Sequence, residues 1–255
     1  MTSRIRHPYL DHPGPIPFAH RGGAADGVEN TVFQFRRAVE AGYRYLETDV
    51  HTTRDGRIVA FHDATLDRVT DGAGRIADLP WAEVGRARVG GREPVPLFEE
   101  LLETFPEVRW NVDLKAESAL LPFLDLVART DAWDRICVGS FSEARVVRAQ
   151  RLAGERLATS YGTRGVLNLR LRSWGVPAAV RRSAVAAQVP ESQSGIPVVD
   201  HRFVRAAHAR GLQVHVWTIN EPERMHRLLD LGVDGIMTDH IDTLRKVMED
   251  RGVWA

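Results

Sequence analysis

The fold of this chain is constrained most by an alternation in its sequence. Short runs typical of β-strands are each followed by a pattern typical of a helix, and this happens eight times. Strands that are joined through helices lie parallel to one another. Eight such units in 255 residues favour an α/β fold of the (β/α)₈ TIM-barrel class over an open doubly wound sheet. The expected strands are 16–21, 45–50, 109–114, 136–141, 157–161, 184–189, 213–219 and 235–238.

One segment interrupts the alternation. After a turn at Asp55-Gly56 and a returning strand over 58–61, residues 64–96 carry many glycines and prolines and little periodicity. This segment is too short for a core of its own, so we interpret it as a small cap insertion above the barrel mouth. Residues 1–255 then form a single TIM-barrel domain that contains the insertion.

Local signals set the expected helix ends. Asn30 is a residue type that caps helices, and it precedes an apolar pattern of helical spacing over 31–41. Ser142 likewise precedes the helix expected over 143–151. The stretch 165–182 is the least regular part of the alternation, because a Trp-Gly-Val-Pro run interrupts its helical pattern.

Composition narrows the cellular setting and the partners. The chain has 34 basic and 34 acidic residues, so no net field attracts it to nucleic acid or to an anionic membrane. Without a run of about 18 apolar residues, we expect no stable membrane insertion. Charges and prolines interrupt the first residues, which we expect to form a short irregular arm. A single cysteine, Cys137, favours a reducing compartment, and we expect a cytoplasmic protein whose oligomeric state the sequence does not indicate.

The second expected strand directs two carboxylates into the barrel. Side chains alternate along a strand, so Glu47 and Asp49 share one face. The other face, made of Leu46, Thr48 and Val50, is more apolar and should pack against the helices. Glu47 and Asp49 then point inward, where two neighbouring carboxylates repel each other unless a cation offsets them.

The third expected strand adds another carboxylate and a cation to the same interior. By the same alternation, Asp113 and Lys115 face inward, while the apolar residues between them face the helices. Three hard oxygen ligands, with no cysteine or histidine spacing typical of zinc, favour Mg²⁺ or Ca²⁺. We therefore predict that Glu47, Asp49 and Asp113 bind one divalent cation.

Two histidines stand where acid–base chemistry is expected in such a barrel. His20 ends the first strand and is followed by Arg21 and two glycines, and His62 follows the returning strand. Ordinary histidine pKa values near 6.5 suit both rings to donate and accept protons close to neutral pH. Asp63 could orient the His62 ring through its other nitrogen. His215, on the seventh strand, is expected to be a packing residue.

These residues belong to a pattern that runs from the first strand to the eighth. The whole set, in this order, resembles the glycerophosphodiester phosphodiesterase family, and it is far more specific than any single motif. The segments that carry the resemblance are Ala19-His20-Arg21-Gly22-Gly23, Glu29-Asn30-Thr31, Glu47-Thr48-Asp49-Val50, His62-Asp63, Leu66-Asp67-Arg68-Val69-Thr70-Asp71-Gly72, Asn111-Val112-Asp113-Leu114-Lys115, Val216-Trp217-Thr218-Ile219-Asn220 and Gly232-Val233-Asp234-Gly235-Ile236-Met237-Thr238-Asp239.

The resemblance implies the hydrolysis of glycerophosphodiesters to glycerol 3-phosphate and an alcohol. It implies that His20 and His62 are the general acid and base, without deciding which is which, and that Arg21 contacts the phosphate. Glu29 belongs to the same signature and should lie near the metal or the substrate. Lys115 should help to hold the phosphate.

Two further expectations concern the pocket and the metal. By its strand position, Trp217 should line the pocket as an apolar wall for the glycerol or the departing group. The family usually has Glu where this chain has Asp113, and the shorter side chain reaches less far by about one C–C bond, roughly 1.5 Å. Asp113 could therefore bind the metal through a water molecule.

Two other functions are compatible with the same scaffold. One is a phospholipase D-like barrel that acts on lysophospholipids or sphingomyelin, which needs an apolar channel near the mouth. The polar insertion over 64–96 argues against it. The other is a barrel that binds phosphodiesters without catalysis, against which the paired histidines and the acidic residues argue. The expected ligand is a small glycerophosphodiester of undetermined head group.

Overall fold

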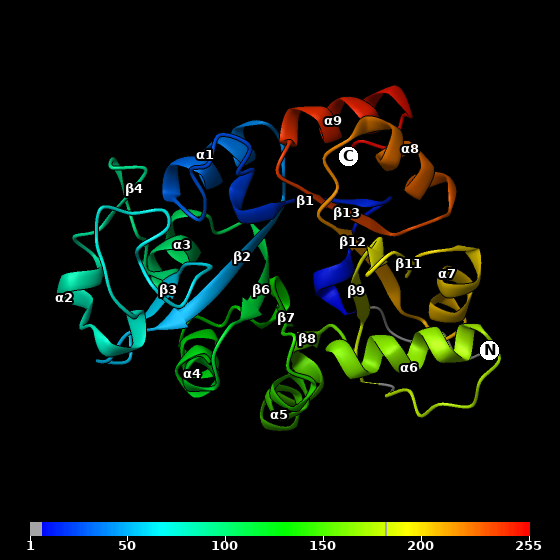
Figure 1. Ribbon diagram of the computed structural model, residues 1–255, viewed down its shortest axis with the longest axis horizontal. Coiled ribbons are helices and arrows are strands. Elements are labelled where there is room, and N and C mark those ends of the chain that lie inside the picture. The colour runs from blue at the N-terminus through cyan, green and yellow to red at the C-terminus, as the bar shows by residue number, and fades with distance from the viewer. Residues whose placement is uncertain (1–6, 182) are drawn as a thin grey trace.

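Eight parallel strands form a barrel in which each strand lies beside the next one in chain order (Figure 1). The computed structural model describes residues 7–181 and 183–255. The predicted TIM-barrel class is confirmed. The barrel strands are β1 (Ile16–Ala19), β2 (Tyr45–Thr52), β6 (Arg109–Leu114), β7 (Ile136–Gly139), β8 (Ala158–Thr159), β9 (Ala186–Pro190), β12 (Gln213–Trp217) and β13 (Gly235–Thr238).

The barrel closes where β8 meets β9. The Tyr161 amide donates to the Ala186 carbonyl at 3.0 Å, and the Val185 amide donates to the Thr159 carbonyl at 2.8 Å. At the other closure β1 pairs with β13 in parallel. The hydrogen-bonded ring therefore has the sequential strand order that the alternation of strands and helices predicted.

Helices surround the strands on the outside (Figure 1). Ser142 caps α5 as predicted, because its hydroxyl accepts from the Arg145 amide. The α-helices of this outer layer are α1 (Val32–Glu40), α3 (Phe98–Thr104), α4 (Leu120–Arg129), α5 (Glu143–Ala153), α6 (Thr163–Ser173), α7 (His201–His208), α8 (Pro222–Asp230) and α9 (Ile241–Asp250). Short 3₁₀ turns lie at Pro8–Leu10, His20–Gly22, Ile76–Asp78, Glu117–Ala119, Trp133–Arg135 and Gly154–Arg156.

The stretch that was least regular in sequence contains α6. This helix ends at Ser173, just before the Trp-Gly-Val-Pro run, as the breaking effect of glycine and proline predicts. Arg182, the last residue of that stretch, lies outside the described residues. The bounds of β6 and β13 coincide with the predicted ones.

Helix α1 is capped by Thr31, and the prediction that Asn30 caps it is wrong. The Thr31 hydroxyl accepts from the Gln34 amide at 3.2 Å. Asn30 has φ +55°, in the left-handed region that asparagine tolerates better than most residues. Its side chain turns toward β2, where it donates to Asp49 Oδ2 at 3.3 Å and accepts from the Thr48 hydroxyl at 2.7 Å.

The predicted inward and outward faces of β2 are the observed ones. Leu46 and Val50 belong to the main apolar cluster, which also contains side chains of the surrounding helices. Tyr45 belongs to a separate cluster in the barrel interior. The parallel register with β6 sets Asp49 beside Asp113. The inward positions that follow Tyr45 toward the mouth are therefore acidic.

The N-terminal arm closes the bottom of the barrel, a role that the sequence did not reveal. Tyr9 is fully buried and packs with Phe18 and Tyr45 in the interior cluster. The Tyr45 hydroxyl donates to the Tyr9 carbonyl at 2.7 Å. Over residues 7–15, the part of the arm that the structure describes, the chain is irregular as expected from its prolines, with one 3₁₀ turn over Pro8–Leu10.

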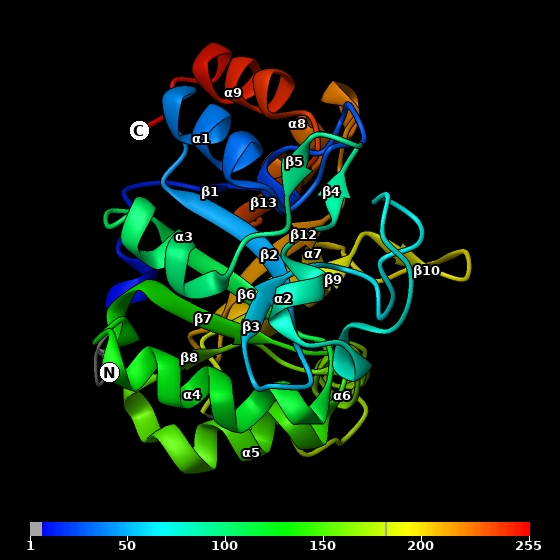
Figure 2. The same cartoon turned by 90° about the vertical axis from the view of Figure 1, so that its left-hand side faces the viewer.

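The insertion lies on β3 (Ile58–Ala60), which pairs antiparallel with β2. It contains α2 (Trp81–Val84), β4 (Arg88–Val89) and β5 (Glu93–Pro94). Its loops project on the same side of the molecule as the hairpin of β10 (Ser192–Gln193) and β11 (Ile196–Pro197) (Figure 2). Its apolar side chains pack together with barrel residues in one cluster, made of Val28, Val59, Phe61, Leu66, Ile76, Val84, Ala87, Val89 and Val95.

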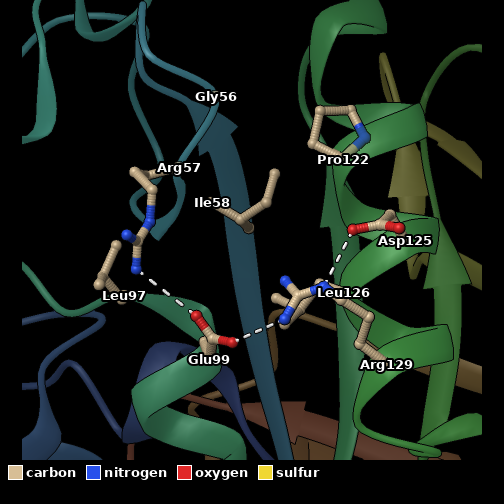
Figure 3. Close-up of a pocket in the computed structure, with 9 residues that line it drawn as sticks. All are labelled: Gly56, Arg57, Ile58, Leu97, Glu99, Pro122, Asp125, Leu126 and Arg129. Atoms are coloured by element: carbon tan, nitrogen blue, oxygen red, sulfur yellow. Dashed lines mark hydrogen bonds and ion pairs between the residues drawn. The ribbon is translucent and has the colours of Figure 1, made fainter.

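The outer face of the barrel carries a cleft between α3 and α4. Its volume is about 320 Å³, and its charged residues pair with one another (Figure 3). Glu99 lies between Arg57 and Arg129, and Arg129 also donates to Asp125 at 3.0 Å. None of the predicted site residues lines this cleft. Across residues 7–181 and 183–255, no helix has the length and apolar character needed to cross a membrane.

Candidate active site

His20 lies just after β1 and is held through its Nδ1 atom. Nδ1–H donates to Asp239 Oδ1 at 2.7 Å, since an ionised carboxylate can only accept. Asp239 follows β13 and is itself held by the Asn220 side-chain amide at 3.1 Å. The other ring nitrogen, Nε2, lies 3.7 Å from Glu47 Oε2. Sequence reasoning gave no role to Asp239 or Asn220.

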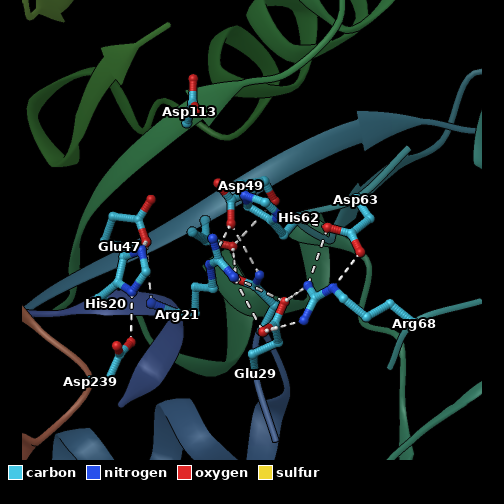
Figure 4. Close-up of polar contacts among 12 residues, drawn as sticks. His20, Arg21, Glu29, Glu47, Asp49, His62, Asp63, Arg68, Asp113 and Asp239 are labelled. Carbon is cyan, nitrogen blue, oxygen red and sulfur yellow. Dashed lines mark hydrogen bonds and ion pairs between the residues drawn. The ribbon is translucent and has the colours of Figure 1, made fainter. Parts of the chain in front are cut away.

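His62 is oriented in the same way. Its Nδ1–H donates to Asp63 Oδ1 at 2.6 Å, which is the contact predicted for this pair. A hydrogen bond from Arg68, together with that from His62, lowers the pKa of Asp63 to about 2. Figure 4 shows His20 and His62 on opposite sides of Arg21. In both rings a carboxylate fixes Nδ1, so Nε2 is the nitrogen that can exchange a proton with a ligand.

Three carboxylates line one wall of the mouth from β2 and β6. Glu47 and Asp49 are 5% and 2% exposed. The Lys115 ammonium lies between Asp49 and Asp113, 2.7 Å from Asp49 Oδ1 and 2.8 Å from Asp113 Oδ2. The second oxygen of Asp113, Oδ1, is buried without a hydrogen-bond partner. In Figure 4 no contact joins Asp113 to the other residues drawn, because its partner is Lys115.

Arg21 crosses the mouth and binds carboxylates on two sides. Its Nε is 3.1 Å from Asp49 Oδ2, and its Nη1 donates to both Glu29 oxygens at 3.2 Å. Its backbone amide donates to Glu47 Oε2 at 3.2 Å. Arg21 has φ +51°, a conformation that is uncommon for residues other than glycine and that clusters at functional sites. The two predicted ligand contacts, Arg21 and Glu29, thus bind each other.

The electrostatics of the mouth follow from burial and from these contacts. Burial, together with the charge of Asp49, raises the pKa of Glu47 to about 7. Burial also opposes ionisation of Asp49, but Lys115 and Arg21 hold the pKa of Asp49 below its usual value. For His20, burial alone would lower the pKa, and the carboxylates of Glu47 and Asp239 outweigh it and raise that pKa.

The mouth carries more negative than positive charge. With neutral imidazoles, the excess of carboxylates repels an anionic ligand such as a phosphodiester. A bound divalent cation would offset most of it. The network contains six carboxylates, on Glu29, Glu47, Asp49, Asp63, Asp113 and Asp239, and three cations, on Arg21, Arg68 and Lys115.

The chemistry of these carboxylates fits a hard divalent cation. They supply oxygen donors alone, and Asp113 Oδ1 has an unused lone pair. Among the described residues, no three aspartate, glutamate, histidine or cysteine side chains already converge as a metal site. Lys115 separates Asp49 from Asp113, so metal binding at these residues requires its ammonium to move.

Trp217 faces inward at the end of β12, as its strand position predicted, and packs on the interior cluster. Its ring meets that of Phe141 edge to face, with 5.8 Å between the centroids. Phe141 follows β7 and is 65% exposed, and the Lys115 ammonium lies 5.8 Å from its ring centroid. The two aromatic rings form an apolar wall beside the charged network. Sequence reasoning did not identify Phe141.

Two other inward-facing residues have packing roles. His215 is fully buried and lies against Phe18 with 4.9 Å between the ring centroids. Burial lowers the pKa of His215 to about 4, so it stays neutral, in agreement with the packing role expected for it. Cys137 is buried at the bottom of the barrel, where burial raises the pKa of its thiol far above the usual value. An unreactive thiol suits a packing residue.

The fold and the site together define a class of protein. Two imidazoles, each oriented by a carboxylate, lie at the mouth of a (β/α)₈ barrel on opposite sides of an arginine. Such a pair can pass a proton to and from a ligand held between them. The surrounding cations and hard oxygen donors suit phosphate and a divalent metal. This is the arrangement of a barrel hydrolase for phosphate esters.

Comparisons with known proteins identify the family. The model of the glycerophosphoryl diester phosphodiesterase family matches residues 20–243. The chain is 41% identical over 251 residues to probable glycerophosphodiester phosphodiesterase 2 of Mycobacterium tuberculosis. This alignment covers 96% of this chain and 95% of that protein. It is 28% identical over 268 residues to a lysophospholipase D of Homo sapiens, and that alignment covers 91% of this chain and 85% of that protein.

Solved structures agree in fold. A crystal structure from Silicibacter pomeroyi has a TM-score of 0.80 at 25% identity and covers 97% of this chain and 99% of its own. An Oleispira antarctica phosphodiesterase, solved with the product sn-glycerol-3-phosphate, has a TM-score of 0.78 at 24% identity. The match covers 92% of this chain and 97% of that protein. The chain therefore belongs to the glycerophosphodiester phosphodiesterase family, as the sequence pattern indicated. It is an enzyme, a phosphoric diester hydrolase.

Proposed function

We propose that His20 and His62 are the acid–base pair with which this enzyme hydrolyses glycerophosphodiesters to glycerol 3-phosphate and an alcohol. The observation that carries the proposal is the matched geometry of the two rings, each with Nδ1 fixed by a carboxylate at 2.7 or 2.6 Å. One imidazole removes a proton from the nucleophile, which is water or the neighbouring glycerol hydroxyl. The other protonates the leaving alkoxide. Where the glycerol hydroxyl is the nucleophile, a cyclic phosphodiester forms, and water must then open it to give glycerol 3-phosphate.

Arg21 and Lys115 are proposed to hold the substrate phosphate. Both are bound to carboxylates of the mouth, and both would exchange a carboxylate oxygen for a phosphate oxygen when substrate enters. Glu29 is proposed to act on the substrate through Arg21, because both of its oxygens accept from that guanidinium. This refines its expected role as a substrate contact.

Glu47, Asp49 and Asp113 are proposed to hold one divalent cation, Mg²⁺ or Ca²⁺. The support is their oxygen chemistry, the unpartnered Asp113 Oδ1 and the excess negative charge around them. When bound, the cation supplies Lewis-acid stabilisation of the phosphoryl oxygens. Lys115 must then leave the space between Asp49 and Asp113, which frees its ammonium for the phosphate.

Trp217 and Phe141 are proposed to pack against the glycerol or the departing alcohol. The exposure of Phe141 also favours a second candidate substrate, a lysophospholipid, because an acyl chain would cover it. The relative named lysophospholipase D supports the same candidate. Against it, the large apolar side chains that are exposed on the described residues include none from 64–96.

A small-molecule substrate in the cytoplasm is part of the proposal. Cys137 is buried and unpaired, which suits a reducing compartment. The equal numbers of acidic and basic residues provide no overall attraction to nucleic acid or to an anionic membrane.

The test is an assay of glycerol 3-phosphate release from glycerophosphocholine by the purified chain. We expect release with Mg²⁺ or Ca²⁺, loss of release with excess chelator, and recovery when the cation is returned. The acylated analogue lysophosphatidylcholine should turn over more slowly. If neither cation supports hydrolysis of any glycerophosphodiester, the proposed reaction is wrong. Faster turnover of the acylated analogue would favour the second candidate.

A further inference from the structure

Arg68 connects the insertion to the barrel mouth through two carboxylates. Its side chain is 48% exposed. Its Nη2 donates to Glu29 Oε1 at 2.7 Å and to Asp63 Oδ1 at 3.2 Å, and its Nη1 donates to Glu29 Oε2 at 3.3 Å. Its Nε donates to the second oxygen of Asp63. One guanidinium thus makes a two-point contact with each of two carboxylates, which a lysine ammonium cannot reproduce.

Each of the two carboxylates also holds one residue of the proposed machinery. Asp63 accepts from His62 Nδ1 at 2.6 Å, and Glu29 accepts from Arg21 Nη1 at 3.2 Å. The contacts therefore run without a break from His62 through Asp63, Arg68 and Glu29 to Arg21 (Figure 4). Arg68 is the central member of this series and the one that comes from the insertion.

Regular secondary structure does not position these residues. His62 and Asp63 lie in the loop after β3, and Glu29 lies in the loop before α1. The Glu29 side chain is nearly buried, at 9% exposed, between the guanidinium groups of Arg21 and Arg68. Side-chain contacts join the two loops: Val28 and Phe61 pack in one apolar cluster, and Arg68 supplies the polar contacts between Glu29 and Asp63.

We propose that Arg68 is a positioning residue, which holds the proton-transfer group His62 and the phosphate contact Arg21 in a fixed relation to each other. This inference rests on the function proposed above. In this positioning role, Arg68 acts through Asp63 and Glu29 and touches neither the substrate nor the reacting atoms. A displacement of about 1 Å in such a site can lower the rate by about a hundredfold. The insertion then contributes directly to the alignment of the catalytic groups.

The experiment compares Arg68→Ala and Arg68→Lys with Arg129→Ala. Arg129 is a matched control, because it is 55% exposed and also pairs with two carboxylates, Asp125 and Glu99, on the outer face (Figure 3). For Arg68→Ala we expect kcat to fall and KM to rise, with kcat/KM lowered by roughly tenfold to a hundredfold. Arg68→Lys should recover little of this loss, since lysine keeps the positive charge but lacks the planar guanidinium that contacts both carboxylates at two points each. Arg129→Ala should match the wild type.

Two further variants separate the two sides of the contact series. Asp63→Asn weakens the connection to His62 and should mainly lower kcat. Glu29→Gln weakens the connection to Arg21 and should mainly raise KM. Added guanidinium ion should restore part of the activity of Arg68→Ala, because the site is exposed enough to admit it, whereas ammonium at the same ionic strength should not.

Several outcomes would overturn the positioning role. Wild-type kcat and KM in Arg68→Ala would do so, as would full recovery in Arg68→Lys. Losses that follow the folded fraction, measured by circular dichroism at the assay temperature, would show that Arg68 only anchors the insertion. Full activity in His62→Ala would remove the proposed function together with this role. Loss of activity in His62→Ala without loss in Arg68→Ala would overturn the positioning role alone.

Discussion

The N-terminal end of the barrel interior is filled by apolar and aromatic side chains, whereas the mouth at the other end is lined by charged ones. Tyr9, Phe18 and Tyr45 are fully buried at the N-terminal end. Edge-to-face contacts with centroid distances of 5.5 and 5.4 Å join Tyr45 to the other two. Glu47 and Asp49 follow Tyr45 in the same inward-facing row of β2. One strand therefore supplies both environments.

The two ends make different contributions to the free energy of unfolding. Full burial of an aromatic or large aliphatic side chain stabilises the fold by about 1.5–3 kcal/mol. Buried ion pairs contribute much less, because the loss of hydration offsets most of their attraction. The charged mouth is thus maintained by the stability of the rest of the barrel. Its side chains are held in position by one another, and Arg68 extends this arrangement into the insertion.

The largest expected effect comes from removing an imidazole at the mouth. His20→Ala or His62→Ala should lower kcat/KM by roughly a hundredfold to ten-thousandfold, which is the range for general acid–base groups. Glycerol 3-phosphate release measures it, and urea denaturation should show that both variants remain folded. Full activity in either variant would contradict the proposed pair and leave the mouth without its assigned chemistry.

The next effect belongs to the other end of the barrel. Phe18→Ala removes a fully buried ring that touches Tyr45 and His215, and it should lower the free energy of unfolding by about 3–5 kcal/mol. Urea denaturation measures the loss. The KM of the folded fraction should remain at the wild-type value. A changed KM would show that the two ends are coupled, and the comparison would fail.

The smallest expected effect concerns pH and the metal-free mouth. The pKa of Glu47 is raised from its ordinary value of 4.5 to about 7. Between these values the native state holds a proton that the unfolded chain has released. The free energy of unfolding therefore falls as the pH rises through this window, by about 3 kcal/mol in total. Glu47→Gln should abolish this component of the pH dependence.

Urea denaturation at pH 5 and pH 8, with excess chelator, measures this effect. Adding Mg²⁺ or Ca²⁺ should stabilise the wild type more at pH 8 than at pH 5, because a carboxylate must lose its proton to bind a metal. In Glu47→Gln the added cation should raise the free energy of unfolding by less than it does in the wild type. An unchanged pH dependence in Glu47→Gln would mean that other groups carry the titration.

Sequence periodicity predicted much of the barrel and of one wall of the site. The inward direction of Glu47, Asp49 and Asp113 follows from strand alternation, and the register of β2 with β6 agrees with it. The contact between His62 and Asp63 was also predictable, since the two residues are adjacent in the chain. In each case the relevant geometry extends over a few residues and depends little on the rest of the fold.

Contacts between distant segments were not predictable in this way. Asp239, which orients His20, lies 219 residues away from it and meets it only because β13 pairs with β1. Arg68 was visible as part of a motif, but its partners depend on how the insertion folds over the mouth. Asn30 has a side chain suited to a helix cap, yet tertiary contacts with Thr48 and Asp49 use that side chain elsewhere.

The sequence by itself determined the barrel, the inward row of carboxylates and the family. These depend on hydrophobic period, strand alternation and ordered motifs, all of which are local or linear properties of the chain. Only the tertiary structure decided which cation neutralises which carboxylate. Lys115 lies between Asp49 and Asp113 because β2 pairs with β6. Arg68 lies between Asp63 and Glu29 because the insertion brings it beside the loop before α1. Buried charges must find partners, and their choice is set by distances that exist only after folding.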